Sequence, residues 1–538
     1  MPLVTPLDSS LDPVAIFRSL RPLRRRIWLD SGAGTSPIGK PSRDEKSPPS
    51  EACDPHARYS FFTADPIFEL QANPGDEDPW PELRRLAECL PSCDIASLAS
   101  DASRCDQDEQ TSVQALPPFQ GGLAGIIGYE SSRWIEPHEL ADCHLDQVDD
   151  LPTPAMSFGL FDWTIAIDHF ESKIWLICQG WEKAMFSDTA FDDANQQTYC
   201  QQRMAILAAE RRDQILSLIQ QHVDQANESD GPCACSDSFL EPNAETRSGV
   251  TNNLVSSNFA DGEFRSSVGE IVEGIGRGDS FQVNLAQRLT AQQTCSPEEL
   301  YLSLRAANPA PQSGFYDGGS FHVLSSSPEG FLQIRDKHVV TRPIKGTRKR
   351  TGDESIDRLL AEELMSSEKE RAENIMIVDL MRNDLSQVCT DESVQVTQLC
   401  QLERYEFVQH LVSVVEADLK EDANVVDCLR ACFPGGSITG APKIEAMKII
   451  ARLEPNPRGP YCGSMGYISC SGHADFNILI RTITATAGGL QIPVGGGITA
   501  RSEPAAEEAE TWAKAEGMLR SLGPYEVKTA QFAGDLDQ

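Results

Sequence analysis

Residues 464–499 read SMGYISCSGHADFNILIRTITATAGGLQIPVGGGIT, and this stretch decides the fold class. Its apolar residues alternate with polar ones or run together in short segments between glycines, which is typical of β-strands. We expect strands at 464–469, 476–486 and 489–493. A segment with helical periodicity follows at 504–522. Strands that are distant in sequence, with helices between them, predict an α+β fold.

Two polar stretches divide the rest of the chain. Residues 32–57 are rich in Ser, Pro and charge, and residues 225–257 contain few large apolar side chains and no helical period. Such composition indicates an insertion and a linker. We therefore expect four parts: an N-terminal region at 1–224, the linker at 225–257, a catalytic region at 258–522 and a tail at 523–538.

Composition excludes several classes of protein. The 538 residues carry a formal net charge of −35, whereas nucleic acids and anionic membranes bind basic surfaces. Apolar runs are far shorter than the roughly 20 residues of a spanning helix, and MPLVTPLDSSLDP does not resemble a signal peptide. The 16 cysteines are scattered without zinc spacing, which is typical of reduced thiols. We expect a cytoplasmic protein without nucleic-acid or membrane partners.

Two pairs of glutamates are the first candidate for chemistry. Glu370 and Glu373 are three residues apart in a helical window, so both carboxylates share a face, and Glu507 and Glu510 repeat this spacing. Carboxylates without nearby His or Cys suit Mg²⁺. Either pair taken alone is more typical of a solvated acidic helix face.

A lysine and a third acid follow. Lys345 stands in PIKGT, where we expect a basic turn, and Glu329 stands in SSSPEG at the end of a strand. An amine held in a tight turn can act as a nucleophile, and a rigidly held acid can donate a proton. From composition alone, a basic surface turn is the favoured interpretation of Lys345, and the alternative for Glu329 is an ordinary turn residue.

An arginine and two glycine-rich loops indicate an anionic substrate. Arg481 stands in FNILIRTI, and arginine within an apolar strand usually has an anionic partner. The loops PGGSITGAPK at 434–443 and GGGIT at 495–499 expose backbone N–H groups that bind carboxylate or phosphate. The residues alone therefore indicate a Mg²⁺-dependent enzyme acting on a small anion.

The ordered series of motifs resembles the chorismate-utilising enzymes. The motifs in the catalytic region are SPEGF, RPIKGTRKR, KERAENIMIVDLMRNDLSQV, FVQHLVSVV, PGGSITGAPK, YCGSMGYIS, FNILIRTI, GGGIT and AETWAK. The N-terminal region is similar to component I of anthranilate and aminodeoxychorismate synthases at RYSFFTADP, FQGGLAGIIGYE and LPTPAMSFGLFDWTIAIDH. The resemblance implies a two-sheet, β-sandwich-like core with flanking helices.

The branch of the family depends on Lys345. Anthranilate synthases typically have a PIAGT-like motif at this turn, whereas aminodeoxychorismate synthases typically have PIKGT, which this chain resembles. The segment FQVNLAQR and Asn374 also resemble the aminodeoxychorismate synthase branch. The resemblance implies amination of chorismate to 4-amino-4-deoxychorismate, on the route to 4-aminobenzoate and folate. The ammonia would come from a separate glutamine amidotransferase subunit, because the chain has no nucleophilic-cysteine elbow.

The resemblance also implies roles for individual residues. Glu373 and Glu510 would hold Mg²⁺ on the substrate, and Glu370 and Glu507 would support them through the metal's waters. The substrate would be bound by Arg481, Tyr461, Lys514, Thr439, Gly440, His410, Gly496 and Gly497. Lys345 would attack C2 of the ring while Glu329 protonates the leaving 4-hydroxyl, and ammonia would then attack C4. A pocket for a tryptophan-like ligand would lie at Asp30 and Ser31.

Three alternatives stay open. The first is anthranilate synthase component I, against which Lys345 argues. The second is isochorismate or salicylate synthase, in which water replaces ammonia and the PIKGT lysine is missing. The third is a non-catalytic chorismate-binding homologue, against which the retained Lys345, Glu329 and glutamate pairs argue.

Overall fold

The computed structural model describes residues 2–32, 58–91, 116–140, 147–186, 194–228, 253–404 and 408–527. The expected insertion at 32–57 lies outside the described residues apart from Gly32. In the described part of the chain, no helix is both long enough and apolar enough to span a membrane.

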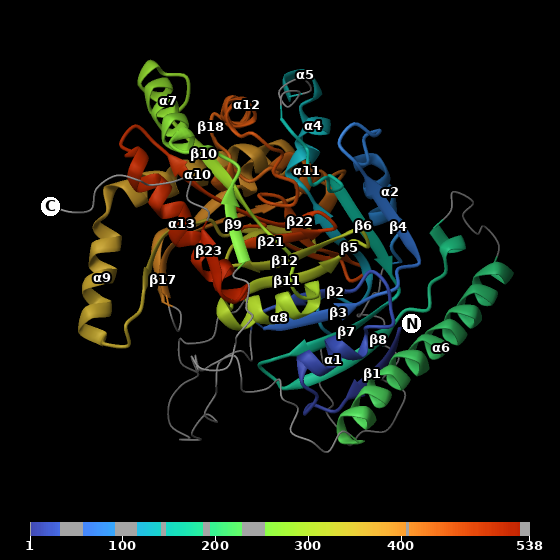
Figure 1. Cartoon of the computed structure of the whole chain (residues 1–538). Coiled ribbons are helices and arrows are strands. Elements are labelled where there is room, and N and C mark those ends of the chain that lie inside the picture. The colour runs from blue at the N-terminus through green and yellow to red at the C-terminus, as the bar shows by residue number, and fades with distance from the viewer. Residues whose placement is uncertain are drawn as a thin grey trace.

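The larger of two sheets joins strands from both halves of the chain. Its order is β1-β8-β7-β3-β2-β11-β12-β21-β22-β10-β9-β23, and β18 also pairs with β10. Figure 1 shows this ladder rising from β1 near the bottom to β22. The strands are β1 (Leu3–Leu7), β2 (Ile27–Asp30), β3 (Tyr59–Thr63), β7 (Trp163–Asp168), β8 (Lys173–Cys178), β9 (Asn253–Ser257), β10 (Gln282–Ala291), β11 (Gln312–Asp317), β12 (Phe321–Ser327), β18 (Gly440–Ala441), β21 (Thr482–Thr486), β22 (Gly489–Ile498) and β23 (Tyr525–Val527).

The second sheet is likewise shared. Its order is β15-β17-β14-β13-β20-β19-β5-β6-β4, and β16 also pairs with β17. All its pairings are antiparallel, for example Ser464 opposite Ile127. The strands are β4 (Phe68–Ala72), β5 (Gly122–Ile127), β6 (Met156–Phe161), β13 (Gly330–Arg335), β14 (His338–Thr341), β15 (Ile344–Lys349), β16 (Gln395–Arg404), β17 (Val408–Asp418), β19 (Ser464–Ser469) and β20 (His473–Asn477).

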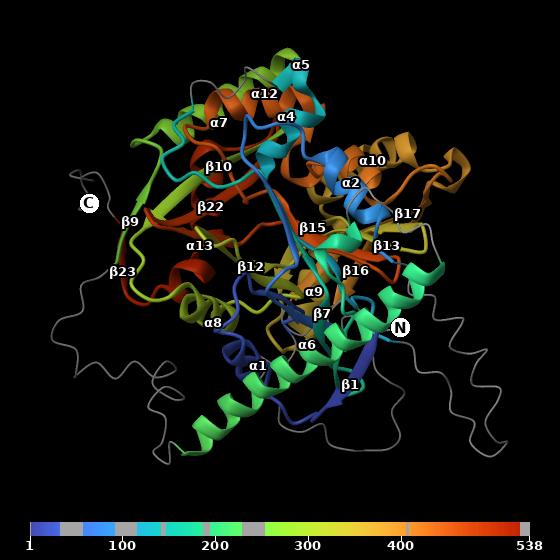
Figure 2. The ribbon, with the colours of Figure 1, turned by 90° about the vertical axis from the view of Figure 1, so that its right-hand side faces the viewer.

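Helices cover the outer faces of both sheets. The α-helices are α1 (Pro13–Ser19), α2 (Trp80–Glu88), α4 (Ser132–Ile135), α5 (Pro137–Leu140), α6 (Ala194–Glu228), α7 (Glu263–Arg277), α8 (Pro297–Ala307), α9 (Glu354–Ser366), α10 (Glu368–Val388), α11 (Val425–Cys432), α12 (Lys443–Leu453) and α13 (Pro504–Ser521). Short 3-10 turns are η3 (Tyr129–Ser131), η4 (Lys183–Phe186), η5 (Asp391–Ser393) and η6 (Gly436–Ile438). Figure 2 shows α6 as a long rod beside α1 and β1.

Alternation along the strands explains this layering. Ile27 belongs to the apolar cluster between the sheets, together with Ala124 and Met465 of the second sheet. The next residue, Trp28, points to the opposite face and packs with α1, α6, α8 and α13. Successive strand residues face opposite sides, so each strand contributes to two cores. The helices α2, α10 and α11 pack on the outer face of the second sheet. The α+β class and the flanked two-sheet core are confirmed.

One expected strand was wrong, and observed elements cross several of the expected boundaries between regions. The strand expected at 476–486 is two strands, β20 and β21, which lie in different sheets. The expected linker at 225–257 begins inside α6 and ends with β9, and the expected tail contains β23, which pairs with β9. Residues 1–224 and 258–522 share both sheets, so they are not separate folding units. Sequence composition cannot reveal this, because strand pairing between distant segments leaves no local signal.

Candidate active site

Lys345 lies in β15, in a strand and not in the expected turn. The strand pairs with β17, with Lys345 opposite Leu411 and Thr347 opposite His410, and the register shifts between them. Gly346 occupies this bulge with φ of +73°. A Cβ there would lie 2.6 Å from Leu364 Cδ1 and 3.1 Å from Glu370 Oε2, so only glycine fits. The bulge therefore holds Lys345 next to the start of α10.

Glu329 lies in the same pocket as Lys345. It connects β12 to β13, is 7% exposed, and its carbonyl accepts a hydrogen bond from Ile478 N. Burial raises the pKa of the Glu329 carboxyl, while the charge of Lys345 and the Ser437 hydroxyl lower it. The Lys345 ammonium itself donates to the Ser437 carbonyl at 3.4 Å. The predicted nucleophile and the predicted acid thus lie close enough for the charge of Lys345 to act on Glu329.

Glu373 faces the same lysine from α10. Its Oε1 atom is buried and accepts no hydrogen bond from any described residue. Burial raises the pKa of Glu373, Lys345 and Lys369 lower it, and the charges of Glu370 and Glu507 raise it further. A buried carboxylate oxygen without a donor is costly unless a cation binds it.

The second glutamate pair approaches from α13 across Gly496 of β22. A Cβ on Gly496 would lie 3.4 Å from Lys514 Nζ and 3.6 Å from both Glu507 Oε2 and Glu510 Oε1. Glu507 is buried and accepts from Ser502 Oγ at 2.6 Å. Gly496 therefore leaves an open cradle that two carboxylates and an ammonium surround.

Glu510 is half exposed and already has a cationic partner. Lys514 Nζ lies 2.7 Å from Glu510 Oε1 and donates to the Gly495 carbonyl at 2.9 Å. Burial raises the pKa of Glu510, but Lys514, Lys369 and Lys345 outweigh this and hold it below its usual value. Glu510 is accordingly an anion in this pocket.

These carboxylates fit a magnesium ion of the usual protein type. Within the described ranges, no group of three or more His, Cys, Asp or Glu side chains is placed to hold a metal ion. Mg²⁺ is commonly bound by one or two carboxylates, with water and substrate oxygens completing the octahedron. Oε1 of Glu373, which accepts no hydrogen bond in the described structure and has Lys369 Nζ at 3.9 Å, and the open cradle at Gly496 are compatible with this description.

Arg481 supplies positive charge to the pocket. It lies between β20 and β21, not inside a strand, with φ of +51°. Its guanidinium makes no ion pair or hydrogen bond with any residue that the structure describes. Burial lowers the pKa of Arg481, and no carboxylate offsets this effect. A largely buried guanidinium without a carboxylate partner is suited to bind an anionic ligand.

His410 lies beside Arg481 and is neutral. It is 8% exposed, and its Nδ1 is 2.9 Å from Thr347 Oγ1. Burial and the nearby charge of Arg481 lower the pKa of His410 to about 4, although the Gly346 backbone and Glu403 oppose this. At neutral pH, His410 therefore contributes a polar ring and no charge.

This shifted pKa predicts a pH-dependent stability. A histidine whose folded pKa is about 4 stabilises the protein fully above pH 6.5, and this contribution is lost as the pH falls toward 4. His410 should account for a loss of about 3 kcal/mol in the free energy of unfolding over this interval. His410→Gln should remove most of that loss in urea titrations. The exposed His338→Gln is the control; equal pH slopes for both variants would contradict the assignment.

The remaining predicted binding residues lie around the same centre. Tyr461 is buried before β19, and its neighbour Cys462 donates through its amide to the Leu479 carbonyl, two residues before Arg481. Thr439 is fully buried, and its hydroxyl donates to the Gly435 carbonyl. Gly440 pairs with β10 in β18, and Gly497 pairs with Asn284 of β10.

Two buried amides in β10 were missed by sequence reasoning. Gln282 is 1% exposed and Asn284 is 7% exposed. Both amide atoms of Gln282 and Oδ1 of Asn284 find no hydrogen-bond partner in the described structure. A Cβ on Gly497 would approach Gln282 Nε2 to 2.7 Å. The alternation in FQVNLAQR places both residues on one face of the strand, and that pattern is the signal that could have found them.

Asp30 and Ser31 lie apart from this cluster. The Asp30 carboxylate is buried and accepts from Arg305 Nε at 2.5 Å, Tyr301 Oη at 3.0 Å and the Gly32 amide at 3.0 Å. Ser31 Oγ lies 3.2 Å from Ser60 Oγ. In the described structure these three donors to Asp30 do not belong to the group of residues around Lys345, so the tryptophan pocket stays a prediction whose carboxylate already has three donors.

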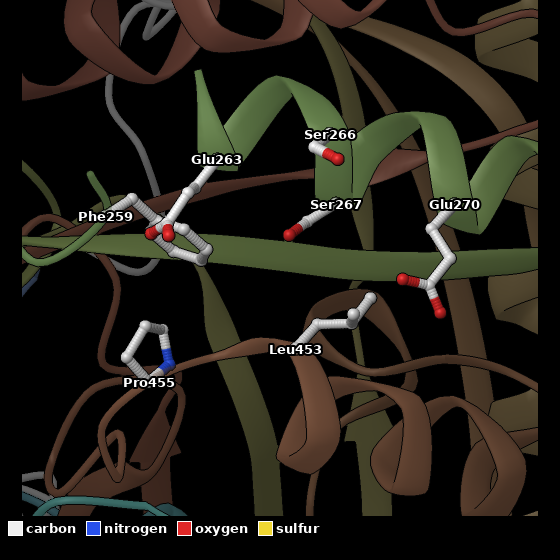
Figure 3. Close-up of a pocket in the computed structure, with 7 residues that line it drawn as sticks. All are labelled: Phe259, Glu263, Ser266, Ser267, Glu270, Leu453 and Pro455. Carbon is white, nitrogen blue, oxygen red and sulfur yellow. The ribbon is translucent and has the colours of Figure 1, made fainter. Parts of the chain in front are cut away.

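A groove of about 290 Å³ lies elsewhere, between α7 and the end of α12. Figure 3 shows Glu263, Ser266, Ser267 and Glu270 of α7 above Leu453 and Pro455. Glu270 pairs with Arg452, and Glu263 accepts from the Ala260 amide. None of the predicted site residues lines this groove.

Comparisons with known proteins agree with the geometry. A family model described as chorismate binding enzyme matches residues 50–520. Aminodeoxychorismate synthase component 1 of Salmonella typhimurium is 37% identical, over 88% of this chain and 91% of that protein. Anthranilate synthase component 1 of Synechocystis sp. is 35% identical, over 86% and 88%. The crystal structure of anthranilate synthase component I from Streptococcus pneumoniae has a TM-score of 0.64 at 29% identity, covering 88% of this chain and 95% of that one.

Proposed function

This chain belongs to the family of chorismate binding enzymes, and we propose that it aminates chorismate at C4 as aminodeoxychorismate synthase component I. One observation carries the choice within the family. The charge of a lysine, Lys345, acts on a buried acid, Glu329, and the guanidinium of Arg481, beside His410 of the paired strand, has no carboxylate partner among the described residues. A nucleophile, a proton donor and an anion-binding group are the parts that this reaction requires.

The substrate is proposed to bind through its two carboxylates. Arg481, Lys514 and the N–H groups of Gly496 and Gly497 are the donors available for them. Mg²⁺ held by Glu373 and Glu510, with Glu370 and Glu507 behind them, would neutralise and orient the ring carboxylate. The neutral ring of His410 would line the pocket, since a charged imidazolium beside Arg481 is disfavoured.

Substitution of the 4-hydroxyl by Lys345 is the first chemical step. The Lys345 ammonium first loses one proton to solvent. The neutral amine then forms a bond to C2, the ring double bonds shift, and the C4–O bond breaks. Glu329 gives its proton to the departing oxygen, so that water leaves. Burial favours this role, because it raises the pKa of Glu329 and keeps the acid protonated at higher pH.

Amination at C4 is the second step. Ammonia forms a bond to C4, the double bonds shift back, and the C2–N bond to Lys345 breaks. The Glu329 carboxylate takes the proton that the incoming nitrogen loses, which restores the starting acid. Because Lys345 occupies C2 in the intermediate, ammonia is directed to C4.

A separate glutamine amidotransferase is the proposed source of ammonia. The similar proteins carry the designation component 1, and no cysteine in the sequence stands in a Gly-x-Cys-x-Gly elbow. The cysteines that the structure describes are all free thiols, which supports work in a reducing compartment.

Product identity tests the proposal. Purified chain, chorismate, ammonium and Mg²⁺ should yield 4-amino-4-deoxychorismate, detected by chromatography with mass detection. Glutamine in place of ammonium should give product only when an amidotransferase is added. Anthranilate as the main product would show instead that the chain is an anthranilate synthase component. Absence of any product under both conditions would favour a non-catalytic binding protein.

A further inference from the structure

The connection between α12 and β19 carries Tyr461 but has no regular secondary structure. Residues 454–463 therefore need support from other parts of the chain, since their backbone groups have no ladder of their own. That support comes largely from the N-terminal region, more than 300 positions away in the sequence.

Glu130 of η3 is the central support. It is 2% exposed, and its two carboxylate oxygens each accept one backbone hydrogen bond, from Arg458 N at 2.8 Å and from Gly459 N at 3.0 Å. The amide of Tyr129 donates in return to the Gly459 carbonyl at 2.8 Å. Gly459 has φ of +61°, a conformation that favours glycine. Glu130 thus determines where the backbone at 458–459 lies.

Arg458 extends this support toward the active site. Its guanidinium is 4.7 Å from the centroid of the Tyr129 ring and 5.9 Å from that of Tyr461. It forms two hydrogen bonds to Glu454, at 2.9 and 2.6 Å, and Glu454 also accepts from the Ala286 amide. All of these groups are buried, so the arginine has a single well-defined position.

The remaining donors of Arg458 reach the glycine-rich loop beneath Lys345. Nη1 donates to the Ile438 carbonyl at 2.9 Å, and Nη2 donates to the Asn284 carbonyl at 2.8 Å. The carbonyl next to Ile438 is that of Ser437, which accepts from Lys345 Nζ. One chain of contacts therefore runs from Glu130 through Arg458 to the acceptor of the catalytic lysine.

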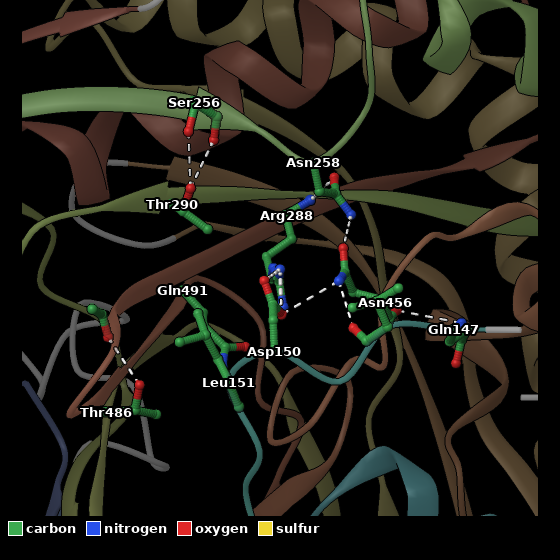
Figure 4. Close-up of polar contacts among 12 residues, drawn as sticks. Gln147, Asp150, Leu151, Ser256, Asn258, Arg288, Thr290, Asn456, Thr486 and Gln491 are labelled. Carbon is green, nitrogen blue, oxygen red and sulfur yellow. Dashed lines mark hydrogen bonds and ion pairs between the residues drawn. The ribbon is translucent and has the colours of Figure 1, made fainter. Parts of the chain in front are cut away.

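A second group of contacts holds the same segment at Asn456. Its side-chain amide donates to the Val148 carbonyl at 2.6 Å and accepts from Asn258 Nδ2 at 3.0 Å. Figure 4 shows Gln147 on one side of Asn456, the Arg288–Asp150 pair on the other side, and Asn258 above it. These contacts anchor the start of the segment but do not reach Ser437.

We infer that Glu130 is a positioning residue for catalysis. By binding the backbone N–H groups of residues 458 and 459, Glu130 fixes the position of Arg458. Arg458 in turn binds the Ile438 carbonyl and so fixes the neighbouring Ser437 carbonyl, which orients Lys345. The assignment of Lys345 as nucleophile rests on the proposed function, whereas the positioning rests on the contacts themselves. A glutamine at position 130 would keep one oxygen that accepts a backbone hydrogen bond. Its NH₂ group would face the other backbone N–H, and two donors cannot form a hydrogen bond.

Kinetics and hydrogen exchange test this inference together. Glu130→Gln should lower kcat for ammonium-dependent amination by about 10²-fold, with a smaller change in KM for chorismate. Amide exchange in peptides covering 436–441 and 458–463 should become faster by about tenfold, while strands β7 and β8 exchange as in the wild type.

Asp162→Asn is the matched control. Asp162 is another buried carboxylate, 3% exposed, and its partner is Arg211 at 3.5 Å. The Asp162→Asn variant should leave amide hydrogen exchange at 436–441 and kcat unchanged. Wild-type exchange in Glu130→Gln, or the same exchange pattern in both variants, would overturn the inference. If Glu130→Gln does not fold, the same measurements on Glu130→Asp decide the question. Amide hydrogen exchange is measured without any enzymatic reaction. It therefore tests the positioning role even if the chain does not aminate chorismate.

Discussion

Lys345→Ala should abolish formation of 4-amino-4-deoxychorismate, with a fall in kcat of about 10³-fold or more. The variant removes the only proposed covalent route to C4. Any residual amination should occur at C2, because ammonia can then attack the position that Lys345 occupies in the wild type. A change of product, and not only of rate, is therefore expected.

The structure makes this expectation specific to one lysine. The charge of Lys345 acts on Glu329, Glu373 and Glu510. Lys349 of the same strand is exposed and serves as the control. Lys349→Ala should retain the wild-type rate and product.

A direct observation of the intermediate completes this test. Wild-type protein mixed with chorismate in the absence of ammonium should gain the mass of chorismate less one water, located on Lys345 by peptide mapping. Unchanged product and rate in Lys345→Ala would contradict the covalent role.

Glu373→Gln should lower kcat/KM by about 10³-fold at low Mg²⁺ concentration. The amide cannot replace the negative charge of Oε1, which accepts no hydrogen bond from the described residues and has the Lys369 ammonium 3.9 Å away. The apparent affinity for Mg²⁺ should fall by at least about 10-fold, and excess Mg²⁺ should recover only part of the rate.

Stability separates metal binding from general damage. The pKa of Glu373 is raised by burial and by Glu370 and Glu507, so the ionised group destabilises the metal-free protein as the pH rises above the ordinary glutamate pKa. Glu373→Gln should therefore leave the metal-free melting temperature equal or higher at pH 8, while the increase caused by Mg²⁺ disappears. Glu368→Gln, at the exposed first position of α10, is the control. A retained Mg²⁺-dependent increase in Glu373→Gln would exclude Glu373 as a ligand.

Local pattern was sufficient for several parts of the fold and the site. The strand Ser464–Ser469 was predicted with its observed bounds, and Glu370 and Glu373 share one helix as their spacing required. Alternation and three-residue spacing are properties of the backbone itself, so they can be recognised without knowledge of the neighbours.

Other local predictions failed where the tertiary structure changes the backbone. Arg481 breaks the apolar run 476–486 with a left-handed conformation, because its two flanking strands belong to different sheets. Lys345 lies in a strand with a bulge, because β17 pairs with both sides of Gly346. Neither partner is near in sequence.

The sequence by itself determined which chemical groups this protein has: a lysine, a buried acid, two glutamate pairs and an arginine, in motifs of one enzyme family. Only the tertiary structure decided how these groups meet. It placed the Lys345 ammonium next to the Ser437 carbonyl and paired Asp30 with Arg305. Among the described residues, it left Arg481 without a carboxylate partner. It also brought Glu130 to the backbone of Arg458 across 328 positions. Such contacts depend on long-range pairing and burial, which no local spacing of residues encodes.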